Sequence, residues 1–375
     1  MREGHEDPIG ERVVVAMSGG VDSSVAVALL KNRGYEAVGV TLDLKPPVAG
    51  RGPSNERDAK RVCALLGIPH HTLDMRDLFD SRVVTPFVES YLEGLTPNPC
   101  VECNRHVKFG RLLDMISTWD ARYLATGHYA RVEEAGTFRR LLKAADAGKD
   151  QSYFLYRLSQ KELGKAIFPV GGMTKTEVRA EARRLKLPTA ERPQSQDVCF
   201  IPRGDYRRFL AVHAGRPHAP GRIRDAGGRI LGTHRGLSSY TIGQRRGIGI
   251  SAKEPMFVIE LDTATNTLVV GPENEALASS CRVRRVSWTR PMPERRLTAS
   301  VKIRHRHRGE EAILDVSGDG REAAVRFSAP QRAVTPGQSA VFYEGDEVLG
   351  GGIISRPDPA RGSVPPSPDP SRRGR

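Results

Sequence analysis

Short apolar runs alternate with amphipathic stretches over the first two hundred positions of the chain. The runs typical of buried strands occupy residues 13–17, 37–42, 71–73 and 123–127. The stretches with helical periodicity occupy residues 22–31, 57–66 and 108–119. Parallel strands joined by crossover helices produce this alternation. The pattern therefore predicts an α/β domain over residues 1–200, built on a doubly wound parallel sheet.

The pattern changes beyond about residue 201, where strands become short and no long helical period remains. We expect a small β-rich domain over residues 201–275. Alternation such as AVRF and SAVFY predicts a β-barrel, closed or nearly closed, over residues 276–356. The last stretch, residues 357–375, is rich in proline and arginine and has little to bury, so we expect it to be disordered.

One helix start can be predicted from local chemistry. Thr174 and Glu177 have the spacing of a capping box, which predicts a helix that begins after Thr174 and runs to Leu185. Pro188 follows and is expected to prevent its continuation.

Composition narrows the class of protein. The 375 residues carry 58 Lys and Arg against 44 Asp and Glu, a net charge of +14, which favours a polyanionic partner such as nucleic acid. Five cysteines are too few for a disulfide framework and indicate a reducing compartment. No apolar run reaches the length of a membrane span, and the amino end lacks a secretory signal. We expect a cytoplasmic protein with no membrane partner.

The string SGGVDSS, residues 18–24, lies between the first strand and the first helix. Two glycines permit a tight turn, and the amino end of a helix attracts phosphate. Asp22 could assist a Mg²⁺ ion carried by a nucleotide. The string lacks the lysine of a Walker loop and the spacing of a dinucleotide site, and a capped tight turn is the simpler alternative. The full string resembles the pyrophosphatase loop of the adenine-nucleotide alpha-hydrolase superfamily, whose members cleave ATP to AMP and pyrophosphate.

Two cysteine segments have the character of chemical sites. Cys100 and Cys103 form a CxxC after two prolines, and Cys199 lies in SQDVCFIP. This spacing suits thiol exchange or half of a zinc site, although core cysteines or a coincidental pair would also give it. Cys63 and Cys281 are expected to be core residues.

Four strings in order resemble the tRNA-specific 2-thiouridylase family. They are TPNPCVECN, GKDQSYFLY, SQDVCFIP and QRAVTPGQSAVFY, and the similarity runs from about residue 13 to residue 354. The resemblance implies ATP-dependent 2-thiolation of the wobble uridine of tRNA. The ATP loop suits this reaction, because the urea-like C2 carbonyl of uridine needs adenylation before sulfur can displace its oxygen. A cysteine persulfide then delivers the sulfur, and a second thiol cleaves the S–S link to leave a disulfide.

Family position implies a role for individual residues. Cys103 corresponds to the nucleophile and Cys199 to the persulfide carrier. The implied ATP contacts are Ala16, Met17, Ser18, Gly19, Gly20, Val21, Asp22, Ser23, Leu42 and Gly127. The implied tRNA contacts are Asn98, Pro99, Cys100, His128, Lys149, Asp150, Gln151, Arg304, His305 and Gln338. A cysteine desulfurase or a sulfur-relay protein is implied as the donor.

Cys100 departs from the family pattern, because some members carry an aspartate there that is proposed to assist proton transfer. An alternative to the persulfide route follows from this departure. Cys100, Cys103 and Cys199 together could hold an iron–sulfur cluster with one open iron site, as in related thiolating enzymes.

The start of the predicted barrel is strongly basic. Residues 281–310 contain ten Lys or Arg against two Glu. In KIRHRHR, residues 302–308, the cations alternate, so a strand would place all four on one face and favour an RNA contact over a merely solvated strand. Two other functions fit parts of the pattern: an amidating ligase that shares the ATP loop, and a non-catalytic RNA-binding protein.

Overall fold

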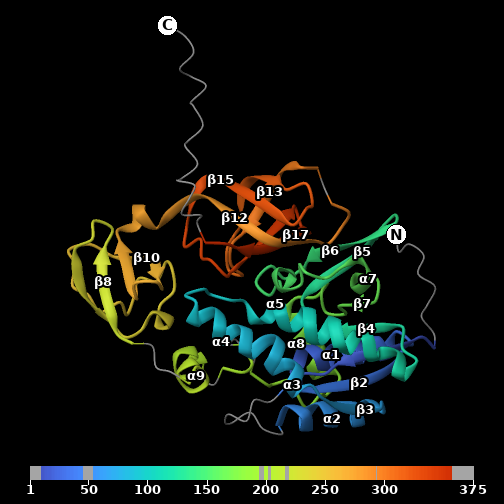
Figure 1. The fold of residues 1–375 in the computed structure, drawn as a ribbon. Coiled ribbons are helices and arrows are strands. Elements are labelled where there is room, and N and C mark those ends of the chain that lie inside the picture. Colours follow the sequence, from blue (N-terminus) through green and yellow to red (C-terminus); the bar gives the residue numbers. More distant parts are fainter. Residues whose placement is uncertain are drawn as a thin grey trace.

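The computed structural model describes residues 10–44, 54–193, 198–201, 204–215, 219–292 and 294–356. Within them, the strands form three β-sheets of five, four and eight strands. Figure 1 shows the α/β part from blue to green, the small sheet with β8 and β10 in yellow and orange, and the barrel in orange and red. The tail at residues 357–375, predicted to be disordered, lies outside the described residues.

The first sheet is parallel throughout and has the order β3-β2-β1-β4-β7. Its strands are β1 (Arg12–Ala16), β2 (Glu36–Asp43), β3 (His70–Asp74), β4 (Tyr123–Thr126) and β7 (Ala166–Ile167). Val13, Val14 and Val15 are all completely buried. A strand covered on both faces has such a continuous apolar run, and the predicted doubly wound α/β domain is confirmed.

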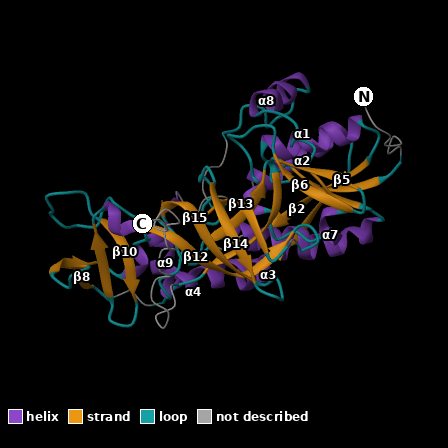
Figure 2. Cartoon of the chain, turned by 90° about the horizontal axis from the view of Figure 1, so that it is seen from above, coloured by secondary structure: helices purple, strands orange, loops and turns teal. Residues whose placement is uncertain are grey.

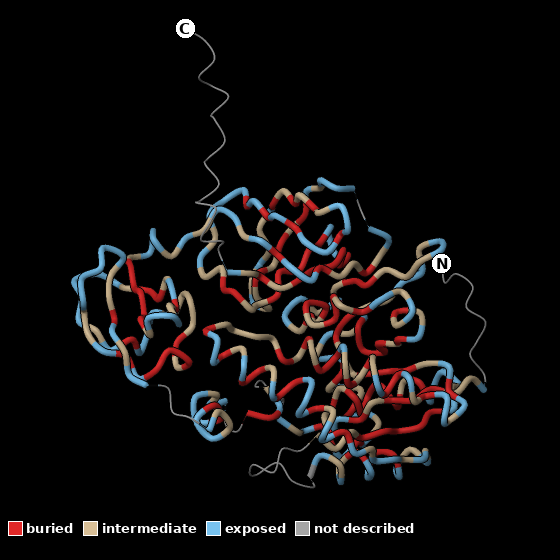
Figure 3. Tube along the Cα trace, in the orientation of Figure 1, coloured by how far each residue is buried: buried red, intermediate tan, exposed pale blue. Residues whose placement is uncertain are grey.

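Helices cover the two faces of this sheet separately. Val13 and Val15 belong to one buried cluster with side chains of α1 (Val21–Asn32), α2 (Ser54–Leu66) and α8 (Lys175–Arg184). Val14 belongs to a second cluster with side chains of the π-helix η2 (Asn104–Leu112), α6 (Leu113–Met115) and η3 (Ile116–Trp119). The predicted helix at 108–119 is thus part of a longer helical segment. The buried stretches in Figure 3 run along this sheet and through the barrel.

The capping box at Thr174 and Glu177 is confirmed, since each side chain bonds the backbone N–H of the other residue. The sequence pattern missed several elements of this domain. They are α3 (Arg76–Phe79), η1 (Asp80–Val84), α4 (Thr85–Leu92), α5 (Pro99–Cys103), β5 (Ala130–Ala135), β6 (Phe138–Lys143), η4 (Ser152–Phe154) and α7 (Gln160–Leu163).

A small four-stranded sheet follows α9 (Tyr206–His213), and its order is β10-β11-β8-β9. Its strands are β8 (Gly221–Asp225), β9 (Ile230–His234), β10 (Phe257–Asp262) and β11 (Thr267–Gly271), with the short helix η6 (Leu237–Ser239) after β9. Ile223, Val258 and Leu268 are buried in its separate core.

The last six strands close into an antiparallel barrel, because the first of them, β12, pairs with both β15 and β17. The barrel follows the short helix η7 (Glu273–Ala276). Its strands are β12 (Leu277–Trp288), β13 (Arg296–Lys302), β14 (Glu310–Val316), β15 (Glu322–Arg332), β16 (Ser339–Glu344) and β17 (Glu347–Ile354). The prediction of a closed barrel is confirmed. Seen from above, it lies between β8 and β10 on one side and β5 and β6 on the other (Figure 2).

The prediction of one strand through residues 302–308 is wrong. Strand β13 ends at Lys302, and the chain turns before β14 begins at Glu310. Ile303 is completely buried in the barrel core, the His307 N–H donates to the Arg304 carbonyl, and Gly309 has a φ of +97°. A turn is required here because β13 and β14 pair with each other in opposite directions. The four cations therefore do not share one strand face.

Candidate functional site

The glycine loop lies where the carboxyl end of β1 meets the amino end of α1. Gly20 is the N-cap of α1 and no side chain caps this helix, so its first amides point outward. The hydroxyls of Ser23 and Ser24 donate to the Gly20 carbonyl at 3.1 and 2.8 Å, which draws the loop tight. The first amides of a helix arranged in this way bind phosphate.

Close backbone contacts fix this loop from two sides. Gly19 has a φ of +70°, and a Cβ there would lie 2.1 Å from the Asn55 carbonyl oxygen of α2. Gly127, just after β4, is as tightly placed, since a Cβ there would lie 2.6 Å from the Ser23 amide nitrogen. Both positions therefore require glycine, Gly127 for lack of space alone and Gly19 also for its backbone conformation.

The other residues predicted to contact ATP lie at the same edge. Met17 donates its N–H to the Val40 carbonyl of β2, and its own carbonyl accepts from the Thr41 hydroxyl at 3.1 Å. Leu42 follows at the carboxyl end of β2. Open α/β sheets bind ligands at the carboxyl ends of their strands, so the predicted set is brought together.

Three residues that contact the loop were not predicted from the sequence: Arg192, Tyr129 and Lys175. Arg192 donates to the Gly19 carbonyl at 2.7 Å and contacts Asp58 and Asn55 of α2. Asp22 accepts a hydrogen bond from Tyr129 at 2.8 Å and pairs with Lys175 at 2.5 Å through the same oxygen. Burial, followed by the Asp22 charge, raises the pKa of Tyr129, so its hydroxyl stays a donor. Of these three residues, only Lys175 carries a signal in the sequence, because it directly follows the predicted helix cap Thr174.

The three cysteines singled out from the sequence form one group, called here the thiol cluster: Cys100, Cys103 and Cys199. Cys100 and Cys103 lie on α5, and Cys103 is buried together with Phe200 and Ile201, the two residues that follow Cys199. Cys100 is partly buried, and Cys199 is exposed.

The electrostatics of the thiol cluster agree with this proximity. Burial raises the pKa of Cys100 to about 12 and that of Cys103 to about 11. Cys199 raises the pKa of both thiols further, whereas the Lys108 ammonium lowers it. Lys108 is thus the cation whose charge acts on both thiols.

Lys108 is held by Asn104, which directly follows Cys103, and by His128, which lies just after β4. Its ammonium donates to Asn104 Oδ1 at 3.1 Å and lies 3.3 Å from His128 Nε2. Since an ammonium only donates, Nε2 accepts and Nδ1 carries the proton that is shared with Thr126 Oγ1 at 2.6 Å. Burial and Lys108 hold the pKa of His128 well below its ordinary value, so this imidazole is neutral.

Several residues predicted to contact tRNA make bonds within the protein. The Asp150 carboxylate is buried and accepts from the N–H groups of Ala144 and Ser152 at 3.2 and 3.1 Å. Gln151 donates its N–H to the Tyr129 carbonyl at 2.8 Å, and its side-chain oxygen accepts from the Tyr129 N–H at 2.9 Å. Lys149 precedes them and donates its N–H to the Asp146 carbonyl at 3.0 Å.

The remaining predicted tRNA contacts lie where the barrel meets the α/β domain. His305 Nε2 lies 3.0 Å from the Asp150 carbonyl, and its ring lies 4.5 Å from that of Phe154. Gln338 donates to the Thr96 carbonyl at 3.1 Å. Arg304 and Asn98 also have partners in the protein: Arg304 donates to the Arg332 carbonyl, and Asn98 bonds the Tyr153 hydroxyl. Pro99 is the first residue of α5.

The described residues give no support to a metal centre. Among them, no group of three or more His, Cys, Asp or Glu side chains is placed to hold a metal ion. Within these ranges, the structure therefore gives no support to the iron–sulfur alternative. Nor does any helix in the part of the chain that the structure describes have the length and apolar character to cross a membrane.

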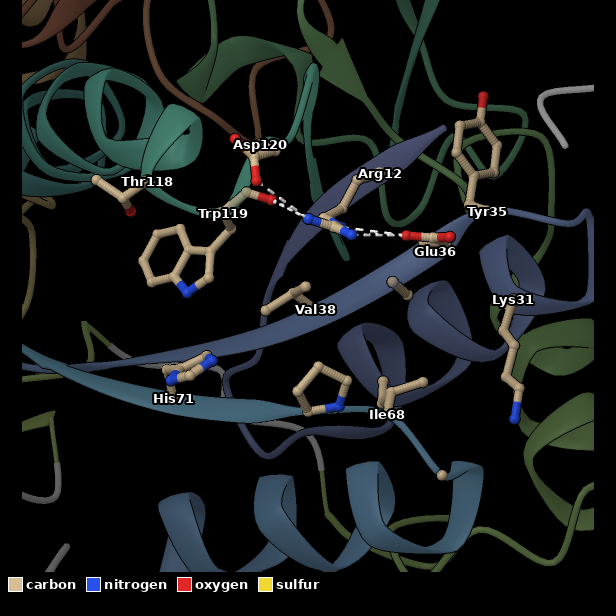
Figure 4. Close-up of a pocket in the computed structure, with 13 residues that line it drawn as sticks. Arg12, Lys31, Tyr35, Glu36, Val38, Ile68, His71, Thr118, Trp119 and Asp120 are labelled. Carbon is tan, nitrogen blue, oxygen red and sulfur yellow. Dashed lines mark hydrogen bonds and ion pairs between the residues drawn. The ribbon is translucent and has the colours of Figure 1, made fainter. Parts of the chain in front are cut away.

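A cleft with a volume of about 580 Å³ lies elsewhere. Figure 4 shows it at the amino ends of β1 and β2, where Arg12 pairs with Glu36 and lies beside Asp120. The glycine loop is at the opposite end of β1, so this cleft is separate from the candidate site.

Family models match three successive parts of the chain. Residues 11–203 match the tRNA methyl transferase HUP domain, residues 207–272 the tRNA methyl transferase PRC-barrel domain, and residues 278–354 the aminomethyltransferase beta-barrel domain.

Curated relatives match nearly the whole chain. The tRNA-specific 2-thiouridylase MnmA 1 of Caldanaerobacter subterraneus subsp. tengcongensis is 44% identical, and the alignment covers 93% of this chain and 99% of the relative. The tRNA-specific 2-thiouridylase MnmA of Syntrophotalea carbinolica is 46% identical, with 92% and 99% covered. That of Sorangium cellulosum is 47% identical, with 94% of each chain covered.

One solved structure, a 4-thiouridine synthetase–RNA complex with bound ATP, aligns with 55% of this chain and 51% of that chain. Its TM-score is 0.37 and its sequence identity is 18%.

Proposed function

Because the chain belongs to the tRNA-specific 2-thiouridylase family, we propose that it transfers sulfur to the wobble uridine of tRNA through a persulfide on Cys199. The protein is a tRNA-uridine 2-sulfurtransferase, and ATP and tRNA are its substrates. The roles of individual residues below are part of the proposal, as is Mg²⁺, which would arrive with the ATP.

One observation supports this assignment: contacts that run from the glycine loop to Lys108, together with the charge of Lys108, connect the loop with the thiol cluster. Gly127 packs against the backbone of the loop, and His128 follows it directly in the chain. His128 contacts Lys108, whose charge acts on Cys100 and Cys103. Activation by ATP and delivery of sulfur can therefore occur in neighbouring places at one edge of the sheet.

The first step activates the uridine. The C2 oxygen attacks the α-phosphorus of ATP, pyrophosphate leaves, and the oxygen becomes part of an adenylate. The amino end of α1 stabilises the negative charge on the phosphates. Glycine at positions 19 and 127 keeps the loop close to its neighbours, which fixes the direction of its amides.

The second step transfers sulfur. The terminal sulfur of the Cys199 persulfide attacks C2 and AMP leaves. The Cys103 thiolate then attacks the inner sulfur on Cys199, which breaks the S–S bond, leaves the thiocarbonyl on the base and joins the two cysteines in a disulfide. Burial raises the pKa of Cys103 to about 11, and the positive charge of Lys108 opposes this effect and favours the thiolate. The exposure of Cys199 supports loading by an outside donor, a cysteine desulfurase or a sulfur-relay protein.

The test is a thiolation assay with unmodified tRNA, ATP and a sulfur source, with the iron content of each preparation measured. We expect Cys103→Ser and Cys199→Ser to form no 2-thiouridine, while Cys281→Ser, a change in the distant barrel, behaves as wild type. Pyrophosphate release should require tRNA. Full turnover by Cys199→Ser would exclude the persulfide route, and pyrophosphate release without tRNA would favour an amidating ligase. Activity that follows iron content would favour the cluster.

A further inference from the structure

The thiol cluster contains one thiol more than the proposed reaction uses. Cys100 precedes Cys103 by one turn of α5, and residues three apart on a helix are neighbours, with Cβ atoms about 5–6 Å apart. A disulfide needs a Cβ–Cβ separation of about 3.5–4.5 Å. The two Cβ atoms would therefore have to approach by about 1–2 Å for a bond to form, and a CxxC pair is the usual arrangement for reversible oxidation.

The proposed reaction leaves a disulfide with two unlike sulfur atoms. Cys103 is 8% exposed and packs among aromatic side chains, including Phe87 and Phe200. Cys199 is exposed. A bulky external reductant can approach Cys199 but has little access to Cys103, whereas Cys100 is already beside Cys103 and only partly buried.

We propose that Cys100 is a resolving thiol, which exchanges with the Cys103–Cys199 disulfide and releases Cys199. The Cys100 sulfur attacks the Cys103 sulfur, a Cys100–Cys103 bond forms, and the Cys103–Cys199 bond breaks. Cys199 leaves with the electron pair and takes up the proton that Cys100 loses, so the exchange involves no net oxidation. An external dithiol then supplies two electrons and two protons to reduce Cys100–Cys103. This inference rests on the proposed persulfide route.

The different burial of the two sulfur atoms sets the direction of exchange. Attack on Cys103 expels Cys199, whose negative charge water can stabilise. Attack on Cys199 would instead expel a buried Cys103 thiolate, which is a poorer leaving group because burial disfavours the charge. The exchange thus frees the exposed cysteine for a new sulfur atom before the buried pair has been reduced.

The experiment is a disulfide map after one turnover. Protein treated with a chelator is loaded with persulfide and mixed with ATP and tRNA without reductant. It is then quenched in acid, alkylated and digested, and the disulfide-linked peptides are identified by mass spectrometry. In wild type we expect a Cys100–Cys103 link and alkylated Cys199 in most of the protein. In Cys100→Ser we expect a Cys103–Cys199 link instead, and Cys281→Ser should give the wild-type map.

The possible outcomes separate this inference from the proposed function. A wild-type map with Cys103 linked to Cys199 and Cys100 alkylated overturns the resolving role and leaves the sulfur transfer intact, and so does a Cys100–Cys199 link. No disulfide on Cys103 in either wild type or Cys100→Ser, with thiolated tRNA formed, contradicts the persulfide route itself. Since the wild-type map decides the question, the result does not depend on the activity of Cys100→Ser.

Discussion

Replacing Gly127 by alanine tests whether the end of β4 fixes the ATP loop. The added Cβ would lie 2.6 Å from the Ser23 amide nitrogen and 2.8 Å from the Asp22 carbonyl carbon, both of which are backbone atoms. Ordinary contacts begin at about 3.4 Å, so the loop has to move away by most of an ångström. Extra atoms in a packed site cost about 1–3 kcal/mol, and a shift of about 1 Å can reduce a rate about 10²-fold.

We therefore expect Gly127→Ala to lower kcat/KM for ATP by about 10- to 100-fold, measured as tRNA-dependent pyrophosphate release over a range of ATP concentrations. A hundredfold loss corresponds to about 2.7 kcal/mol, within the cost of the close contact. Gly172→Ala is the matched control, because a Cβ there meets nothing within 4 Å. Thermal unfolding of both variants checks that the fold is retained. If Gly127→Ala keeps kcat/KM for ATP within twofold of wild type, the close packing does not position the loop.

Two further changes test the thiol cluster and the barrel. Lys108→Met should raise the pKa of Cys103 above about 11, because the Lys108 charge lowers it. The assay is modification by iodoacetamide at pH 9, in protein whose Cys100 and Cys199 are replaced by serine. Cys103 should then react several-fold more slowly. Lys108→Arg keeps the charge and should retain most of the rate, and an unchanged pH profile in Lys108→Met would contradict the assignment. In the turn after β13, Arg306 and Arg308 are exposed, so Arg306→Ala with Arg308→Ala should weaken tRNA binding and reduce its salt slope by about one per cation. The control Arg33→Ala, at an exposed site beside α1, should change neither the affinity for tRNA nor the salt slope. Equal salt slopes in wild type, the double variant and the control would exclude this turn from the RNA surface.

Sequence patterns predicted the elements that depend on neighbouring residues. The buried run of β1 and the capping box of α8 are local signals, and both are present. The turn after Lys302 was missed because charge alternation imitates a strand, while the burial of Ile303 in the barrel decides the path of the chain. The β5–β6 hairpin was missed since part of its stability comes from pairing with β17, far along the sequence. Neither spacing nor periodicity could show that Lys108 lies beside the cysteines.

The α/β domain and the barrel are joined by the same backbone that supports the ATP loop. The Asp150 carbonyl meets His305 of the barrel, while the next residue, Gln151, bonds the Tyr129 backbone. Tyr129 in turn donates to Asp22 in the loop. A tRNA that contacts residues 149–151 or the barrel turn would therefore act on a chain of hydrogen bonds that ends at Asp22 in the glycine loop. If ATP and tRNA both bind one arrangement of these residues more tightly, each raises the affinity for the other by the same factor, which gives a physical reason for ATP cleavage to depend on tRNA.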